Sequence, residues 1–286
     1  MSKIEFKFGG NSIEVNPPQY GYNSEIHLSM HRAPDMSDGE VHWYDNGSEY
    51  DWRVFNCPLI LNEQEQYDLQ DFFKDDDKGR AKAIQMKVPA GIYPFGPDLG
   101  GGVRRFQVRL LNNVFSGARQ SPYITFHSNL SFLLVSAPSY SVPSISYEVR
   151  NLQIGTVSGL RHPPGWINPS TRYGVQTIVT YGGGRPLNKS ENADIYRTEF
   201  DLEDTINKTA NLLRYFQNTA RSNTFTIKAQ KNSFLFGRDN SSIHDDDAGA
   251  GSYVVTLDDN IVTTIHTRKD LFKTKIKMAY RSHSGL

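Results

Sequence analysis

The stretch Tyr93-Pro94-Phe95-Gly96-Pro97-Asp98 has a counterpart in the second half of the chain, Phe234-Leu235-Phe236-Gly237-Arg238-Asp239. In both, a glycine follows a phenylalanine and an aspartate comes two residues later. Phe95 and Phe236 are 141 positions apart (236 − 95). A glycine and an aspartate after an aromatic residue favour a turn, with the aspartate bonding its own backbone. We therefore interpret Phe95, Gly96, Asp98, Phe236, Gly237 and Asp239 as structural turn residues of a repeat. A ligand loop in both copies is the alternative.

Three further pairs of segments follow the same order. Residues 84–87 and 225–228 are strand-like, residues 69–73 and 212–216 resemble the end of an amphipathic helix, and residues 106–110 and 253–257 alternate again. Four matches in one order indicate a tandem duplication. A period near 141 (225 − 84) fits two domains and is too long for a solenoid.

Composition narrows the class of protein. A chain of 286 residues predicts one large or two ordinary domains, and 37% hydrophobic residues are enough for a core in each half. The formal net charge of +0 gives no overall field toward nucleic acid or membrane. The single cysteine, Cys57, excludes an internal disulfide and a cysteine-based zinc site. With no secretory leader and no long apolar run, we expect a protein that is made in a reducing cytoplasm and has no membrane partner.

Residues 1–24 are expected to form an N-terminal hairpin arm. Ile4, Phe6 and Phe8 alternate with polar residues, and Ile13 and Val15 do so after a Gly-Gly-Asn turn. The hairpin is interpreted as the edge of the first domain. An arm that pairs with a neighbouring subunit is the alternative.

Residues 25–136 are expected to form the first domain. Asn46-Gly47 predicts a tight hairpin turn, residues 45–48, between strands near residues 41–43 and 50–54. Asn62, with Glu65 three residues later, predicts the start of a helix. Strands near residues 84–88, 106–110 and 130–135 should follow.

Residues 137–149 are expected to be a linker, and residues 150–286 a second domain with the same plan. Strands near residues 173–181 and 196–200 are separated by a long polar loop, residues 182–193. A helix over 206–216 and strands over 225–227, 253–257 and 272–278 come next. The predicted fold is mainly β: two duplicated antiparallel β-sandwich or barrel domains, each with one flanking α-helix.

Little in the sequence points to catalysis. His27 and His31 lie on a strand-like segment, where residues four apart are too distant to share a metal. His244, before three aspartates, lacks the spacing of a calcium loop. Residues 183–190 resemble a phosphate-binding loop but have Asn188 in place of its second glycine. We therefore expect no enzyme activity, no catalytic residues, no cofactor and no metal site.

Lys273, Lys275 and Lys277 alternate along the last strand. We interpret them as the wet face of an amphipathic strand that also discourages edge aggregation. The alternative is a cationic wall facing DNA or an acidic partner, with phosphate contacts only.

The order of features resembles long-tailed bacteriophage tail proteins of the tail-tube and distal-tail (baseplate hub) group. The residues that carry this resemblance are Pro18-x-Tyr20-Gly21, Asp38-Gly39, Leu59-x-Leu61-Asn62, Asp71-Phe72-Phe73, Ile84-x-Met86 and Phe95-Gly96-Pro97-Asp98. Such proteins have a β-sandwich with a flanking helix and stack as rings around a channel. Some carry two tube-like domains per chain, so that three chains give a pseudo-six-fold ring.

The resemblance implies a structural virion component that is assembled in the host cytoplasm. Its expected partners are copies of itself, in a trimer with pseudo-six-fold symmetry or a hexamer, neighbouring tail proteins, and DNA passing the channel in non-specific contact. The alternative is a carbohydrate-binding, receptor-binding β-sandwich of the virion. Trp43, Trp52 and Trp166 are candidates to stack on sugars, although alternation favours core positions for Trp43 and Trp52.

Overall fold

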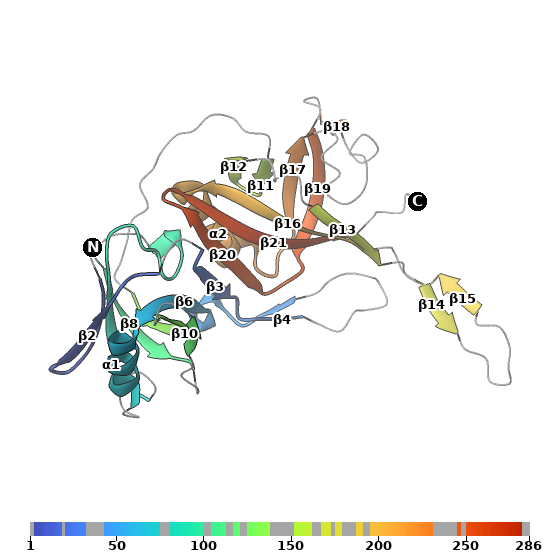
Figure 1. Ribbon diagram of the computed structural model, residues 1–286. Coiled ribbons are helices and arrows are strands. Elements are labelled where there is room, and N and C mark those ends of the chain that lie inside the picture. The colour runs from blue at the N-terminus through green and yellow to red at the C-terminus, as the bar shows by residue number, and fades with distance from the viewer. Residues whose placement is uncertain are drawn as a thin grey trace.

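The fold is mainly β and antiparallel, as predicted (Figure 1). The computed structural model describes residues 3–18, 21–32, 43–74, 81–99, 104–112, 117–120, 125–137, 152–161, 167–172, 175–178, 187–190, 195–230, 245–246 and 250–281. Within these ranges the chain forms two α-helices and many strands, and the strand ladders of its two halves are connected.

The first half forms one antiparallel ladder in the order β3–β6–β10–β8–β7–β1–β2. Strand β9 pairs with the start of β10, on the edge of β10 that β8 occupies further along. A small hairpin, β4–β5, lies between β3 and β6 in the chain. The elements are β1 (Ile4–Phe8), β2 (Asn11–Val15), β3 (Asn23–His27), β4 (Met30–Arg32), β5 (Trp43–Asp45), η1 (Ser48–Tyr50), β6 (Trp52–Asn62), α1 (Glu63–Lys74), β7 (Ile84–Val88), η2 (Pro97–Leu99), β8 (Arg104–Leu110), β9 (Gly117–Gln120) and β10 (Thr125–Ser136).

The second half repeats this order as β13–β16–β21–β19–β17–β11–β12. Strand β20 pairs with the start of β21, as β9 does with β10, and the hairpin β14–β15 takes the chain position of β4–β5. The elements are β11 (Leu152–Ile154), β12 (Val157–Leu160), β13 (Ile167–Arg172), β14 (Val175–Ile178), β15 (Leu187–Ser190), β16 (Ile195–Thr205), α2 (Ile206–Tyr215), the π-helical turn η3 (Phe216–Ala220), β17 (Phe225–Gln230), β18 (Asp245–Asp246), β19 (Ala250–Leu257), β20 (Ile261–Arg268) and β21 (Leu271–Arg281).

The two halves therefore share one order of strand pairing. The helices also take the same place: α1 follows β6 directly, and α2 follows β16. Strands β6 and β16 are each the second strand of their ladder. The shared order supports the inferred tandem duplication.

Helix α1 begins where the sequence predicts. The Asn62 side chain accepts a hydrogen bond from the Glu65 backbone N–H at 2.8 Å, and the Glu65 carboxylate accepts one from the Asn62 N–H at 3.0 Å. This reciprocal capping satisfies N–H groups that the first helical turn leaves without partners. Leu69, Phe72 and Phe73 on the inner face are buried.

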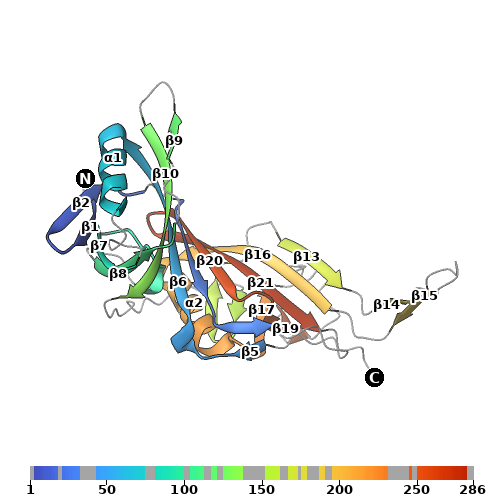
Figure 2. The same ribbon diagram turned by 90° about the horizontal axis from the view of Figure 1, so that it is seen from below.

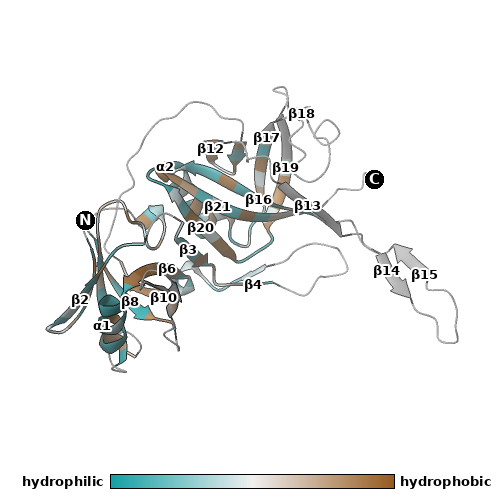
Figure 3. Ribbon diagram, in the orientation of Figure 1, coloured by the Kyte–Doolittle hydropathy of each residue, from teal (hydrophilic) through white to brown (hydrophobic). Residues whose placement is uncertain are grey.

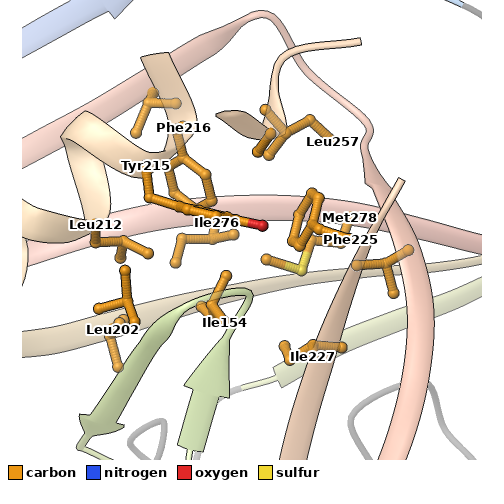
Figure 4. Close-up of a cluster of buried hydrophobic side chains, with 14 of the residues drawn as sticks. Ile154, Leu202, Leu212, Tyr215, Phe216, Phe225, Ile227, Leu257, Ile276 and Met278 are labelled. Atoms are coloured by element: carbon orange, nitrogen blue, oxygen red, sulfur yellow. The ribbon is translucent and has the colours of Figure 1, made fainter. Parts of the chain in front are cut away.

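Each half has its own hydrophobic core. The first core comes from the first half alone. The second core also takes Ile26, Leu28 and Met30 from the first half. Strands β16, β20 and β21 alternate between hydrophobic and hydrophilic residues, as expected for strands with one face in a core (Figure 3). Figure 4 shows the second core, where side chains from α2, η3, β11, β16, β17, β19 and β21 meet: Ile154, Leu202, Leu212, Tyr215, Phe216, Phe225, Ile227, Leu257, Ile276 and Met278.

The N-terminal hairpin belongs to the first ladder. Strand β1 pairs with β2 and, on its other edge, with β7. Within this chain the hairpin is thus an edge of the first half, the first of the two alternatives. The expected boundary at residue 24 falls inside β3.

The predicted hairpin around Asn46-Gly47 is wrong. Strand β5 pairs with β4, while both edges of β6 are occupied, by β10 and β3. Gly47 has φ 105° and ψ 148°, which is not a type I′ conformation, and its N–H donates to the Asp45 carboxylate at 2.9 Å. The expected pairing of the matching strands in the second half is also wrong, because β14 pairs with β15, and β15 lies inside the segment expected to be a polar loop. The expected linker, residues 137–149, lies outside the described residues except for Ala137.

Candidate assembly interface

The two halves meet edge to edge. Strand β3 of the first half pairs with β20 of the second, from Asn23 opposite Ile265 to His27 opposite Ile261. The ladder is extended at both ends, because the Leu28 N–H donates to the Asn260 carbonyl at 2.8 Å and the Gly21 N–H to the His266 carbonyl at 2.7 Å. Since β3 also pairs with β6, the sheet runs from one half into the other.

The turn of residues 93–98 lies at this junction and packs on helix α2. Gly96 has φ +96°, a conformation that favours glycine, and a Cβ there would lie 3.5 Å from Leu213 Cδ1. The neighbouring Phe95 is fully buried. The Arg214 guanidinium donates to the Asp98 carbonyl at 3.4 Å. The turn of the first half thus contacts the helix of the second.

Arg53 of β6 fixes this turn. Its guanidinium donates to the Phe95 carbonyl at 2.8 Å, to Asp98 Oδ1 at 2.7 Å and to the side-chain oxygen of Gln217. Asp98 is buried and forms an ion pair with Arg53. The carboxylate therefore binds Arg53 rather than its own backbone, which corrects the sequence interpretation of that residue. Phe236, Gly237 and Asp239 of the second copy lie outside the described residues.

Arg221, just after η3, joins the second half to the hairpin region of the first. It donates to both oxygens of Asp45 at 2.6 Å and to Asp51 Oδ2 at 2.7 Å. The side chains of Arg221 and Asp51 are only 6% and 4% exposed. The hydrogen bond from Arg221 holds the pKa of Asp45 below its usual value, and the two carboxylates raise the pKa of Arg221. This fork of bonds is the geometry that guanidinium groups form best with carboxylates.

A buried histidine completes the junction. The Tyr22 hydroxyl lies 2.5 Å from His266 Nδ1 and accepts a hydrogen bond from the Tyr93 N–H at 2.9 Å. The Tyr22 proton is then available for Nδ1, which fits a neutral imidazole. Burial lowers the pKa of His266, in agreement with that form. The ring also stacks on Phe272, with centroids 4.4 Å apart.

These contacts join the two halves of the chain. The junction is held by ladder hydrogen bonds, by a core that takes side chains from both halves, and by the ion pairs of Arg53 and Arg221. Neither Arg53 nor Arg221 belongs to a motif that predicts its role from the sequence. The sequence gives one indication that Arg53 is buried: its charge lies directly before the apolar residues that begin at Val54. The sequence gives no such indication for Arg221, because its partners lie about 170 residues earlier in the chain.

The lysines of β21 lie on a face of mixed charge. Lys273 pairs with Asp201 at 2.7 Å, Lys275 with Glu199 and Lys277 with Asp259 at 2.7 Å. Their side chains are 37–47% exposed, which fits a wet strand face. The hydrogen bond that the Lys277 ammonium donates to the Asp259 carboxylate raises the pKa of Lys277. The strand is not an edge, because β16 lies on one side of it and β19 and β20 on the other, so protection of an edge is not the role of these lysines.

Two of the three tryptophans lie in described residues. Trp43 packs partly buried against the second core and donates its indole N–H to the Leu257 carbonyl at 2.8 Å. Trp52 is 44% exposed and stacks on His27 at 3.7 Å, so the core position expected for it is wrong. Trp166 lies outside the described residues.

The residues weighed for metal or phosphate binding are dispersed. His27 pairs with Glu25 at 3.1 Å, and His31 lies on β4. The described part of the chain contains no group of three or more His, Cys, Asp and Glu side chains that could hold a metal. Cys57 is buried, and burial raises the pKa of its thiol. Residues 187–190 of the phosphate-loop candidate form β15, while residues 183–186 and His244 lie outside the described residues.

No protein-family model and no curated protein matches this chain. Among the described residues, no helix has the length and apolar character needed to span a membrane.

Proposed function

We propose that this protein is a structural component of a long-tailed bacteriophage tail, of the tail-tube or distal-tail (baseplate hub) type, that assembles as a ring around the tail channel. In this proposal three chains close a ring with pseudo-six-fold symmetry, and a hexamer is the alternative. The ring contacts neighbouring tail proteins and touches passing DNA without sequence specificity. It is assembled in the host cytoplasm, becomes part of the virion and has no catalytic role.

One observation carries the proposal: two units with the same order of strand pairing are joined edge to edge through β3 and β20. The contact is head-to-tail, because the β3 edge of one half meets the different β20 edge of the other half. Repeating such a contact generates a ring when the rotation closes. The mainly β fold with one helix per repeat agrees with the tail-tube resemblance in the sequence.

Electron microscopy of the purified protein tests the proposal. Negative-stain images over a range of micromolar concentrations should show rings with a central channel and three chains each. A chain that stays monomeric at every concentration, with and without crowding agents, would contradict the proposal.

A carbohydrate-binding function is the second candidate, and one group of residues favours it. Trp52 is 44% exposed and backed by His27, and Tyr50, two residues earlier, is 63% exposed. Exposed aromatic rings of this kind can stack on sugars. A glycan array comparing the wild type with Trp52→Ala tests this candidate, which requires a glycan signal that the substitution removes.

A further inference from the structure

Among the described residues, the contact between the halves leaves one strand edge in each half without a partner. It uses the β3 side of the first half and the β20 side of the second. Within the described residues, the equivalent of β3 in the second half, β13, pairs only with β16. In the part of the chain that the structure describes, the equivalent of β20 in the first half, β9, pairs only with β10. Each half therefore retains one edge of the kind that the other half has already used.

We propose that β13 of one chain pairs with β9 of a second copy of this chain, repeating between chains the contact that β3 and β20 make within one. This inference rests on the proposed ring and specifies its interface. Unpaired strand edges are templates for such pairing. Because different surfaces meet, the contact is heterologous and propagates from chain to chain.

The helices give independent support. Asn207, Ala210 and Leu213 of α2 are buried, on a face that includes the contact with the turn of the first half. Counted from the first residue of each helix, the same positions of α1 are Gln64, Tyr67 and Gln70, and all three are exposed. Tyr67 is 65% exposed, against 0% for Ala210. The face covered on α2 is thus uncovered on α1, which lies in the same half as β9.

The placement of these surfaces suits a head-to-tail contact. The two views place α1 at one end of the molecule and β13 toward the other (Figures 1 and 2), and Figure 2 shows β9 near α1. In a ring, α1 and β9 of one chain would face the β13 side of the next. Strands β2 and β12 are also outermost in their ladders, but neither is used in the internal contact.

The internal ladder predicts the register of the new one. Asn23 of β3 pairs with Asn56, and Asn168 of β13 pairs with Glu199; Asn56 and Glu199 occupy the same position in β6 and β16. Asn168 is therefore the equivalent of Asn23.

The same reasoning applies to the other strand. Ile265 of β20 lies opposite Lys273, and Ala118 of β9 lies opposite His127. Lys273 and His127 are equivalent, because Lys273 is the third residue of β21 and His127 the third residue of β10. Since Asn23 lies opposite Ile265, Asn168 should lie opposite Ala118 of the next chain. In this register Pro169, which has no N–H to donate, lies opposite Gly117 of the next chain.

A cysteine cross-link tests the register. Residues directly opposite in an antiparallel ladder have Cα atoms about 4.5–5.5 Å apart, within the range a disulfide spans. The full chain carrying Ala118→Cys and Asn168→Cys, oxidised with oxidised glutathione, should give covalent dimers and trimers on a non-reducing gel. The control pair, Ala118→Cys with Thr171→Cys, places the second cysteine three residues away, about 10 Å along the strand, and should give few. The buried Cys57 is common to both variants.

A second variant tests the helix face without a cysteine. Tyr67→Glu should raise the concentration at which the protein assembles by on the order of tenfold, as expected for loss of a central aromatic contact. Tyr50→Glu is the matched control, because Tyr50 is 63% exposed but lies outside this surface, and it should change that concentration by less than about twofold.

The outcomes separate this inference from the proposed function. Rings that form while the two cysteine pairs cross-link equally overturn the β13–β9 interface and leave the ring intact. Absence of both rings and cross-links overturns both. Preferential cross-linking of Ala118→Cys with Asn168→Cys, together with the Tyr67→Glu effect, supports the interface.

Discussion

Replacing Arg221 with alanine should destabilise the junction between the two halves strongly. The change removes three charge-assisted hydrogen bonds and leaves Asp45 and Asp51 without their cation. Losing one partner of a buried ion pair costs about 3–5 kcal/mol. The lower end, about 3 kcal/mol, applies here, because Asp45 is 26% exposed and Asp51 keeps a hydrogen bond from the Ser29 N–H at 2.8 Å.

The assay is urea unfolding followed by tryptophan fluorescence. Arg221→Ala should lower the midpoint, whereas Arg268→Ala, at an exposed arginine, should change the free energy of unfolding by less than about 0.5 kcal/mol. Combining Arg221→Met with Asp45→Asn and Asp51→Asn should recover more than half of the loss, because it also removes the unpaired carboxylates. A loss below about 1 kcal/mol for Arg221→Ala would refute the reasoning.

The same group predicts a dependence on acid. Arg221 lowers the pKa of Asp45 in the folded state. The stability that Asp45 contributes is therefore fully present above the unfolded value of about 3.9 and is lost as the pH falls through the folded pKa below it. The difference between wild type and Arg221→Ala should shrink over that acidic window.

Three other outcomes are expected. His266 has a lowered pKa in the fold, so the wild type should lose stability as the pH falls below about 6.5, and His266→Gln should flatten that slope in urea midpoints measured at several pH values. Gly96→Ala forces a side chain into φ +96° with Asp98 Oδ1 at 3.0 Å and should cost about 1–3 kcal/mol, whereas Gly10→Ala, with nothing within 4 Å of its Cβ, should melt like the wild type. Lys275→Gln should change stability by less than about 1 kcal/mol. Salt-dependent retention of the wild type on random-sequence DNA would support a DNA-facing strand, and no retention would remove that alternative.

Local patterns in the sequence predicted the elements well. Asn62 and Glu65 mark the start of α1 because a capping box depends on residues three apart. Leu69 and Phe73 identify its buried face because residues four apart lie on the same side of a helix. Alternation located β7, β16 and β21, since side chains of a strand point to opposite faces.

Pairing between strands was harder to predict, because it depends on contacts between distant segments. The Asn46-Gly47 dipeptide favours a tight turn, but β6 was already paired on both edges and the Asp45 carboxylate bound the Gly47 N–H instead. Trp52 lies two residues before the buried Val54, so alternation places it on the core side of the strand. It is exposed nevertheless, because it lies at the start of β6 and stacks on His27.

The junction itself was the least predictable feature. Its bonds join residues far apart in the chain, as between Tyr22 and His266 or Arg221 and Asp51. The turn that recurs in the sequence marked one side of the junction, because the Phe95-Gly96 turn contacts α2. The reason for its position, the ion pair of Asp98 with Arg53, required the structure.

Mass photometry over increasing concentration tests the central claim most directly, that one chain carries two repeats whose unused edges complete each other in further copies. Closure of three chains predicts a shift from the mass of one chain to three times that mass, with little beyond it. A distribution that remains at one chain, or that stops at a symmetric pair, would contradict the account.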